Sequence, residues 1–223
     1  MNWILPGTVL EMDRGEADQA EARISALFLA GGMVLSQVTD LTGLEPYTVQ
    51  NWVKRGFLPP PVRKRYSRRQ LCRIININML KSILPMETIC GLLGYVNGAL
   101  NDESDDLIDD AELYFLFVRL AARTDTGAVT ENALTAALSH YVEPAPGARD
   151  RVENTLKIML TAYQAARLRT KAEKIKDVEG ARECMKEILA DMMRVGDPAL
   201  NLNGKPAVVL FIGVNGVGKT TTI

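Results

Sequence analysis

Histidine and cysteine are scarce in this sequence. His140 is the only histidine among 223 residues, and the three cysteines, Cys72, Cys90 and Cys184, are widely separated. A zinc site needs several such ligands close together, and a Ser-His nucleophilic pair needs a positioned histidine. Isolated cysteines in odd number also argue against a disulfide framework. The composition therefore disfavours a self-contained hydrolase or zinc protein and predicts a reducing, cytoplasmic environment.

Long apolar runs are also lacking. The best one, ISALFLAGGMVL from Ile24, has 12 residues and contains two glycines, whereas a membrane-spanning helix needs about 20 apolar residues. The N-terminal stretch MNWILPGTVLEMDRG has neither a basic start nor a small-residue cleavage site, so no signal peptide is expected. A net charge of -1 gives no global attraction to nucleic acid or membranes, and any such signal must be local.

Acidic residues are absent over one long segment, from Pro46 to Met86. The basic residues of the same segment are Lys54, Arg55, Arg63, Lys64, Arg65, Arg68, Arg69, Arg73 and Lys81. The acidic sequence NDESDDLIDDAE follows from Asn101, without the residue order or the glycine of a calcium-binding loop. Two interpretations stay open for it: a solvated connector, or a segment that folds over the basic face and neutralises it.

Periodicity predicts a mainly α-helical protein. We expect helices over 15–34, 36–42, 46–55, 68–83 and 85–93, two more over AELYFLFVRLAAR and VTENALTAALSHY, and a long amphipathic helix over 148–175. A further helix precedes the linker GDPALNLNGKP, and Ala207–Ile212 is the one segment that reads as a strand. The predicted organisation is an N-terminal helical segment (1–34), a helix-turn-helix with its wing (35–95), a helical domain (96–174), a helix and linker (175–206), and a strand with a phosphate-binding loop (207–223).

Residues 36–55 have the pattern of a helix-turn-helix. Gly43 suits the tight turn, and Pro46 suits the first turn of the second helix, where a missing N–H is harmless. The inward-facing apolar residues of this arrangement are Val38, Leu41, Leu44, Val49 and Trp52. The following PPPVRKRYS would form a short, stiff and strongly basic wing.

The sequence LSQVTDLTGLEPYTVQNWVKRGFL resembles the helix-turn-helix of MerR-type regulators, RYSRRQLCRI resembles their wing-to-helix junction, and LPMETICGLL resembles their next helix. An uncharacterised bacterial family of MerR-like proteins with a similar proline-rich, basic segment is a closer likeness. The resemblance implies duplex DNA as the partner. The long helix over 148–175 makes a homodimer a further candidate, and packing of that helix on its own domain explains its apolar stripe equally well. The DNA-contacting residues expected from the outward positions and the wing are Tyr47, Thr48, Gln50, Asn51, Lys54, Arg55, Arg63, Lys64, Arg65, Tyr66 and Arg68. For Tyr66, at the end of the wing, an exposed and a buried position are equally expected.

The last residues, GVNGVGKTTTI, contain the spacing of a phosphate-binding loop behind a predicted strand. Together with the preceding helix they resemble the start of a GTPase domain of the signal recognition particle receptor type. The resemblance implies nucleotide binding by Gly213, Asn215, Gly216, Gly218, Lys219, Thr220 and Thr221, with Thr220 as a Mg²⁺ ligand. The other GTPase motifs would lie after Ile223. We therefore expect GTP and Mg²⁺ as cofactors, and GTPase activity, only for a longer chain.

Three functional hypotheses follow. The first is a DNA-binding, transcription-regulator-like module joined to an incomplete GTP-binding segment. The second is the N-terminal fragment of a GTPase of signal-recognition-particle-dependent protein targeting, with the particle and the inner-membrane surface as partners. The third is a helical protein-interaction domain without DNA binding.

Overall fold

The computed structural model describes residues 2–29, 31–124 and 130–173, together with 180, 182, 183, 185 and 186. This part of the chain is mainly α-helical, as predicted, with one two-stranded sheet. Its principal helices are α1 (Ala20–Ala26), α2 (Leu35–Thr42), α3 (Pro46–Lys54), α4 (Arg68–Leu80), α5 (Met86–Asn97), α6 (Asp110–Arg123), α7 (Glu131–Ala137) and α8 (Ala148–Glu173). Within these residues no helix is both long and apolar enough to cross a membrane.

The N-terminal region differs from the single helix expected over 15–34. The antiparallel strands β1 (Asn2–Ile4) and β2 (Glu11–Asp13) come first, followed by a 3₁₀ helix over Arg14–Gln19 and the short α1. The Asp13 carboxylate accepts a hydrogen bond from the Gly15 N–H and so begins the 3₁₀ turn. At Met33 the chain is no longer helical and forms an antiparallel bridge with Tyr66. The Met33 N–H donates to the Tyr66 carbonyl, and the Tyr66 N–H donates to the Met33 carbonyl. Backbone pairing with a distant segment therefore replaces the last turns of the expected helix.

The α2–α3 pair matches the predicted arrangement. Gly43 ends α2 with a left-handed φ of 67°, and Pro46 begins α3. Added bulk at Gly43 would meet Val9 of the N-terminal loop. The five predicted inward residues are all buried: Val38, Leu41, Leu44, Val49 and Trp52.

A polar contact joins the α2–α3 turn to the rest of the molecule. The Asn78 amide of α4 donates to the carbonyl oxygens of Gly7 and Thr42, both at 2.9 Å. It thereby ties the end of α2 and the N-terminal loop to α4. Asn78 of α4 thus fixes the position of the turn that precedes α3.

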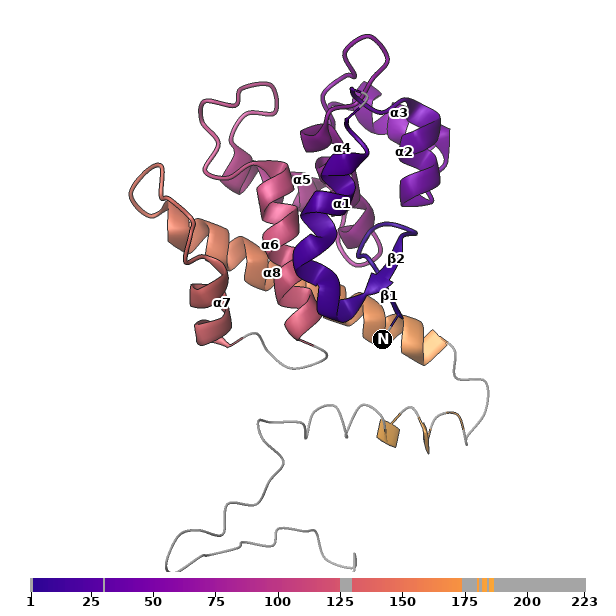
Figure 1. Ribbon diagram of the computed structural model, residues 1–223, viewed down its shortest axis with the longest axis vertical. Coiled ribbons are helices and arrows are strands. Elements are labelled where there is room, and N and C mark those ends of the chain that lie inside the picture. Colours follow the sequence, from indigo (N-terminus) through magenta and orange to yellow (C-terminus); the bar gives the residue numbers. More distant parts are fainter. Residues whose placement is uncertain are drawn as a thin grey trace, which may run out of the picture.

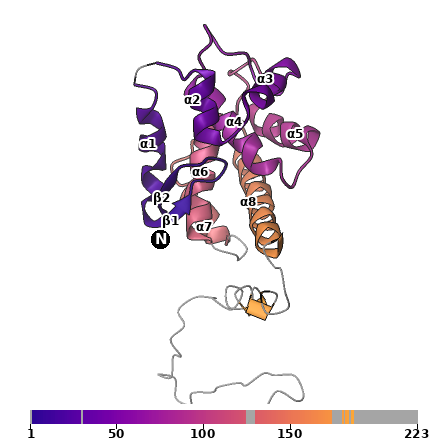
Figure 2. The ribbon, with the colours of Figure 1, turned by 90° about the vertical axis from the view of Figure 1, so that its right-hand side faces the viewer.

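The core is centred on α4 and α6, with α5 and α8 packed alongside (Figure 2). One cluster of buried apolar side chains extends from Leu5 to Ala162 and joins the N-terminal, central and later helices. Periodicity predicts an apolar stripe of Val152, Leu156, Met159, Leu160 and Tyr163 on α8. The first four are buried, and Tyr163 is partly buried against the core. The α2–α3 pair lies at one end of the molecule, away from α7 (Figure 1).

The predictions for the end of the chain fall outside the described residues. They comprise the helix and linker of 175–206, the strand over 207–212 and the phosphate-binding loop with its nucleotide-binding residues. They stay predictions.

Candidate nucleic-acid interface

The outer face of α3 carries the predicted polar residues. Tyr47 is 75% exposed, Gln50 and Lys54 are exposed, and Thr48 and Asn51 are half-buried. Val49 and Trp52 on the opposite side anchor the helix in the core. The α3 side chains expected to contact DNA therefore share one accessible surface.

A tight hairpin follows α3. Val62 and Arg65 exchange two backbone hydrogen bonds of 3.0 and 2.9 Å, and Arg63 and Lys64 form the turn between them. Both turn residues have left-handed backbones, with φ values of 50° and 61°. Two consecutive left-handed residues define the hairpin turn that normally selects Asn-Gly. Arginine and lysine are disfavoured at these positions, because their Cβ atoms make the left-handed backbone conformation unfavourable. The exposed tip therefore carries two cations where the turn geometry would favour asparagine and glycine.

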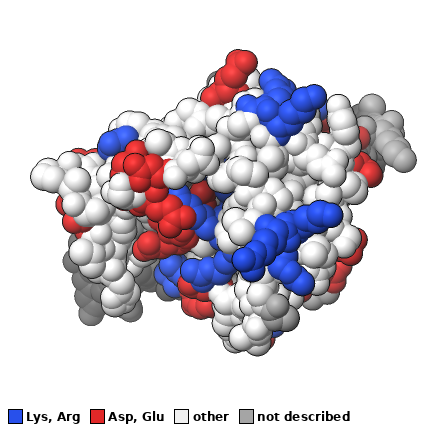
Figure 3. Space-filling view, turned by 90° about the horizontal axis from the view of Figure 1, so that it is seen from above, with Lys and Arg blue, Asp and Glu red and all other residues white. Residues whose placement is uncertain are grey.

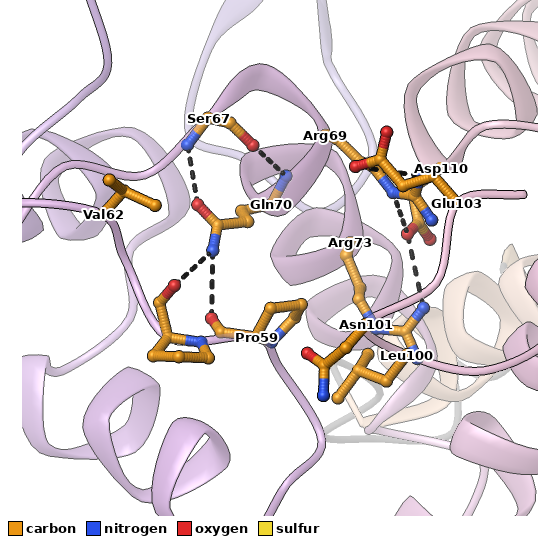
Figure 4. Close-up of a pocket in the computed structure, with 11 residues that line it drawn as sticks. Pro59, Val62, Ser67, Arg69, Gln70, Arg73, Leu100, Asn101, Glu103 and Asp110 are labelled. Atoms are coloured by element: carbon orange, nitrogen blue, oxygen red, sulfur yellow. Dashed lines mark hydrogen bonds and ion pairs between the residues drawn. The ribbon is translucent and has the colours of Figure 1, made fainter.

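Gln70 fixes the proline segment before this hairpin. Its side-chain amide donates to the carbonyl oxygens of Pro59 and Pro60 at 3.0 and 2.9 Å, and its oxygen accepts from the Ser67 N–H (Figure 4). Ser67 in turn caps α4 through the Gln70 N–H. Gln70 was not among the predicted residues, although S-R-R-Q at a helix start is a capping-box pattern that the sequence displays.

Two predicted DNA contacts need correction. Tyr66 is only 3% exposed, and burial raises the pKa of its hydroxyl, so its ring packs inside the protein and is not presented at the wing. The Arg68 guanidinium lies 3.2 Å from Glu21 and 3.1 Å from the Ser25 hydroxyl, so it faces α1. Arg65 stays exposed, and its guanidinium donates to the Gly32 carbonyl. The proposed interface is therefore narrower than the basic sequence suggests.

The acidic segment 101–110 folds against the basic segment, which the sequence left open. Arg69 on α4 is the centre of this contact (Figure 4). Its guanidinium nitrogens lie 2.6 Å from Asp106, 3.3 Å from Glu103, 3.8 Å from Asp110 and 3.9 Å from Asp109. Acidic side chains accordingly gather beside basic ones on this face of the molecule, and further basic side chains lie beyond them (Figure 3).

Arg73 and Asp110 form a buried pair behind this contact. One Arg73 nitrogen lies 3.3 Å from the Asp110 carboxylate, and the Arg73 Nε–H donates to the Phe57 carbonyl at 3.1 Å. Asp110 is 1% exposed, and burial raises its pKa although Arg73 and Arg69 favour the ionised form. The pair makes the first turn of α6 part of the support for the end of α3.

A cavity of about 420 Å³ lies between the hairpin and the acidic segment. Its walls are formed by Pro59, Pro60, Val62, Ser67, Arg69, Gln70, Arg73, Leu100, Asn101, Glu103 and Asp110. The hairpin and the Arg69 cluster therefore border the same space. Among the described residues, no group of histidine, cysteine or carboxylate side chains has the arrangement of a metal site.

Asp106 gives this cluster an expected pH dependence. Burial raises its pKa to about 6, against the opposing effect of Arg69, from an ordinary value of 3.8. A raised pKa in the folded state means that the stability it contributes is present below about pH 4 and is lost as the pH rises through 6. We expect the unfolding free energy of Asp106→Asn, minus that of the wild type, to increase by the order of 1 kcal/mol from pH 4 to pH 7. Urea unfolding across this range is the measurement, and a constant difference would contradict the assignment.

Comparison with known proteins concerns the same region. Residues 30–117 match the family described as Domain of unknown function (DUF1836). The uncharacterized protein YkrK of Bacillus subtilis (strain 168) is 33% identical over 84 residues, which are 36% of this chain and 36% of that protein. The chain thus spans about a third of the length of this curated relative. No solved structure matches the chain. The part of the chain from just before α2 into α6, which contains α3, the hairpin and the acidic segment, is similar to a domain family of unknown function.

Proposed function

We propose that α3 and the Val62–Arg65 hairpin form a duplex DNA-binding surface of the winged helix-turn-helix type, in a transcription-regulator-like module. The observation that carries the proposal is the hairpin tip, where Arg63 and Lys64 adopt left-handed backbones beside α3. Strained residues persist where the surrounding structure holds them and where function uses them. Two cations at a rigid, exposed tip suit contacts to a phosphate backbone.

The composition of α3 supports base contacts next to those phosphate contacts. An α-helix with its side chains is about 10–12 Å wide, which suits the major groove of about 12 Å. Gln50 and Asn51 carry amides of the kind that pair with adenine, and Tyr47 and Thr48 lie at the exposed start of the helix. We assign base reading to these α3 residues and backbone contacts to the cations.

Within the residues that the structure describes, the basic side chains of this surface have no carboxylate partner. Lys54, Arg55, Arg63, Lys64 and Arg65 are exposed, and none forms an ion pair with another residue in the described part of the chain. Arg69 and Arg73 differ, since both are held by carboxylates. The cations without a carboxylate partner thus lie at the end of α3 and on the hairpin, although Arg65 also donates to the Gly32 carbonyl and Arg55 lies over the Phe57 ring.

The direct test is a fluorescence anisotropy titration of a labelled 24-base-pair duplex with the full chain, repeated at several salt concentrations. Five phosphate contacts predict that the logarithm of the affinity falls against the logarithm of salt with a slope of about −4 to −5. Lys157→Ala is the matched control, because Lys157 pairs with Glu131 of α7, at the other end of the molecule (Figure 1). It should leave affinity and slope unchanged. No binding at low salt would reject the proposal and favour the protein-interaction alternative.

A further inference from the structure

We propose that Arg69 is an additional phosphate-binding position of this surface, and that the acidic segment 101–110 covers it as a built-in competitor of DNA. The inference rests on the proposed function. The first observation is the position of Arg69. Because α4 begins at Arg68, Arg69 lies just after the hairpin in the chain, and it borders the same cavity as Val62.

The negative charge around Arg69 exceeds what the arginines compensate. Four carboxylates lie within 4 Å of its guanidinium, and Arg73 pairs with one of them. One carboxylate oxygen of Asp106 and one of Asp110 are buried without a hydrogen-bond partner. A cluster of four carboxylates around one guanidinium is less stable than a single ion pair. The carboxylates repel one another, and two of their oxygens have no hydrogen-bond donor among the described residues.

The four carboxylates are not equally anchored. Asp109 caps α6 through the Ala111 N–H, and Asp110 is fixed by its burial and by Arg73. Glu103 has a side chain that is 79% exposed. The Asp106 side chain, in the loop before α6, is only 8% exposed, but Arg69 is the one hydrogen-bond partner of its carboxylate among the described residues. Glu103 and Asp106 are therefore the partners that Arg69 can exchange, while the Arg73–Asp110 pair stays intact.

A phosphate diester is a suitable replacement for these two carboxylates. Arginine binds both groups through paired, charge-assisted hydrogen bonds. A duplex held by the hairpin brings phosphates at high local concentration to the neighbouring cavity. Displacement of Glu103 and Asp106 would add one contact to the interface, and their retention would repel the duplex.

The test is a double-variant cycle in the same anisotropy titration. Glu103→Gln with Asp106→Asn should tighten duplex binding by about tenfold and steepen the salt slope by about 0.9, the increment for one phosphate. Arg69→Gln alone should change affinity by less than about twofold, because Arg69 is covered in the wild type. Combined with the two neutralised acids, Arg69→Gln should remove most of the tenfold gain.

The matched control neutralises two exposed acids that do not contact Arg69. Asp40 and Glu45 lie on α2 and at the start of α3, so Asp40→Asn with Glu45→Gln also removes two negative charges near the interface. Its gain should be the same whether or not the chain also carries Arg69→Gln. An equal gain for Glu103→Gln with Asp106→Asn in both backgrounds would overturn the inference, because the gain would then be general electrostatics.

Hydrogen–deuterium exchange separates this inference from the proposed function. Arg69→Gln should speed exchange in peptides covering 99–109 without any DNA, because Arg69 holds this segment. Unchanged exchange would reject the inference whether or not DNA binds. Faster exchange together with wild-type DNA binding, but no Arg69-dependent gain, would reject the competitor role and leave the proposed function standing. Absence of DNA binding by every variant would reject the proposed function, and the competitor role with it.

Discussion

Replacing Arg63 with Asn and Lys64 with Gly should weaken duplex binding by about 10- to 100-fold and at the same time stabilise the fold. Two charge-assisted contacts are lost, each worth about 0.7–1.4 kcal/mol, within the net range of a protein hydrogen bond. Asn-Gly is the preferred pair for a turn with two left-handed residues, and the wild-type φ values are 50° and 61°. Relief of the strain should raise the free energy of unfolding by about 1–2 kcal/mol. Urea unfolding and the anisotropy titration measure the two effects.

The opposite signs make this prediction specific. A variant that binds DNA poorly because it is misfolded would lose both properties. Arg63→Ala with Lys64→Ala is the matched control: it removes the same charges but keeps side chains that disfavour the left-handed region. It should lose DNA binding to the same extent and gain no stability. Wild-type affinity in the Asn-Gly variant would refute the assignment of the tip to phosphate contacts.

Arg73→Met should lower the free energy of unfolding by about 3–5 kcal/mol, the usual cost of leaving a buried charge without its partner. Arg73 and Asp110 are 6% and 1% exposed. Loss of the guanidinium leaves the carboxylate with Arg69 at 3.8 Å as its nearest cation and leaves the Phe57 carbonyl without its Arg73 donor. Urea unfolding at pH 7 is the measurement. The deficit should shrink toward acidic pH, because a protonated Asp110 no longer needs a cation.

Two further variants test the cause. Arg73→Met with Asp110→Leu removes both charges and should recover most of the loss, since apolar replacement of a buried pair is often neutral. Lys157→Met breaks the exposed pair with Glu131 and should change stability by less than about 1 kcal/mol. A loss of that small size for Arg73→Met would show that the buried pair does not support α6.

The sequence by itself determined the α2–α3 pair. Gly43 at the turn, Pro46 at the start of α3 and the spacing of Val49 and Trp52 are local signals, because they depend on backbone conformations and helical periodicity within a few residues. The long α8 was equally readable, since a stripe from Val152 to Leu160 repeats over several turns. The exposed residues of α3 followed from the same periodicity. Their DNA contacts stay a proposal.

Tertiary structure alone decided which side chains of the basic segment are exposed and which are buried or paired with carboxylates. Tyr66 and Arg65 are neighbours, yet the Met33–Tyr66 pairing buries one and leaves the other exposed. Arg69 and Arg73 look like Arg63 in the sequence, but they lie one helical turn apart on α4 and face the acidic segment. Whether an arginine of this segment pairs with a carboxylate depends on contacts between residues up to 47 positions apart, as in the Arg68–Glu21 pair. Such contacts depend on how α4 packs on the other helices, and composition and periodicity do not predict that packing.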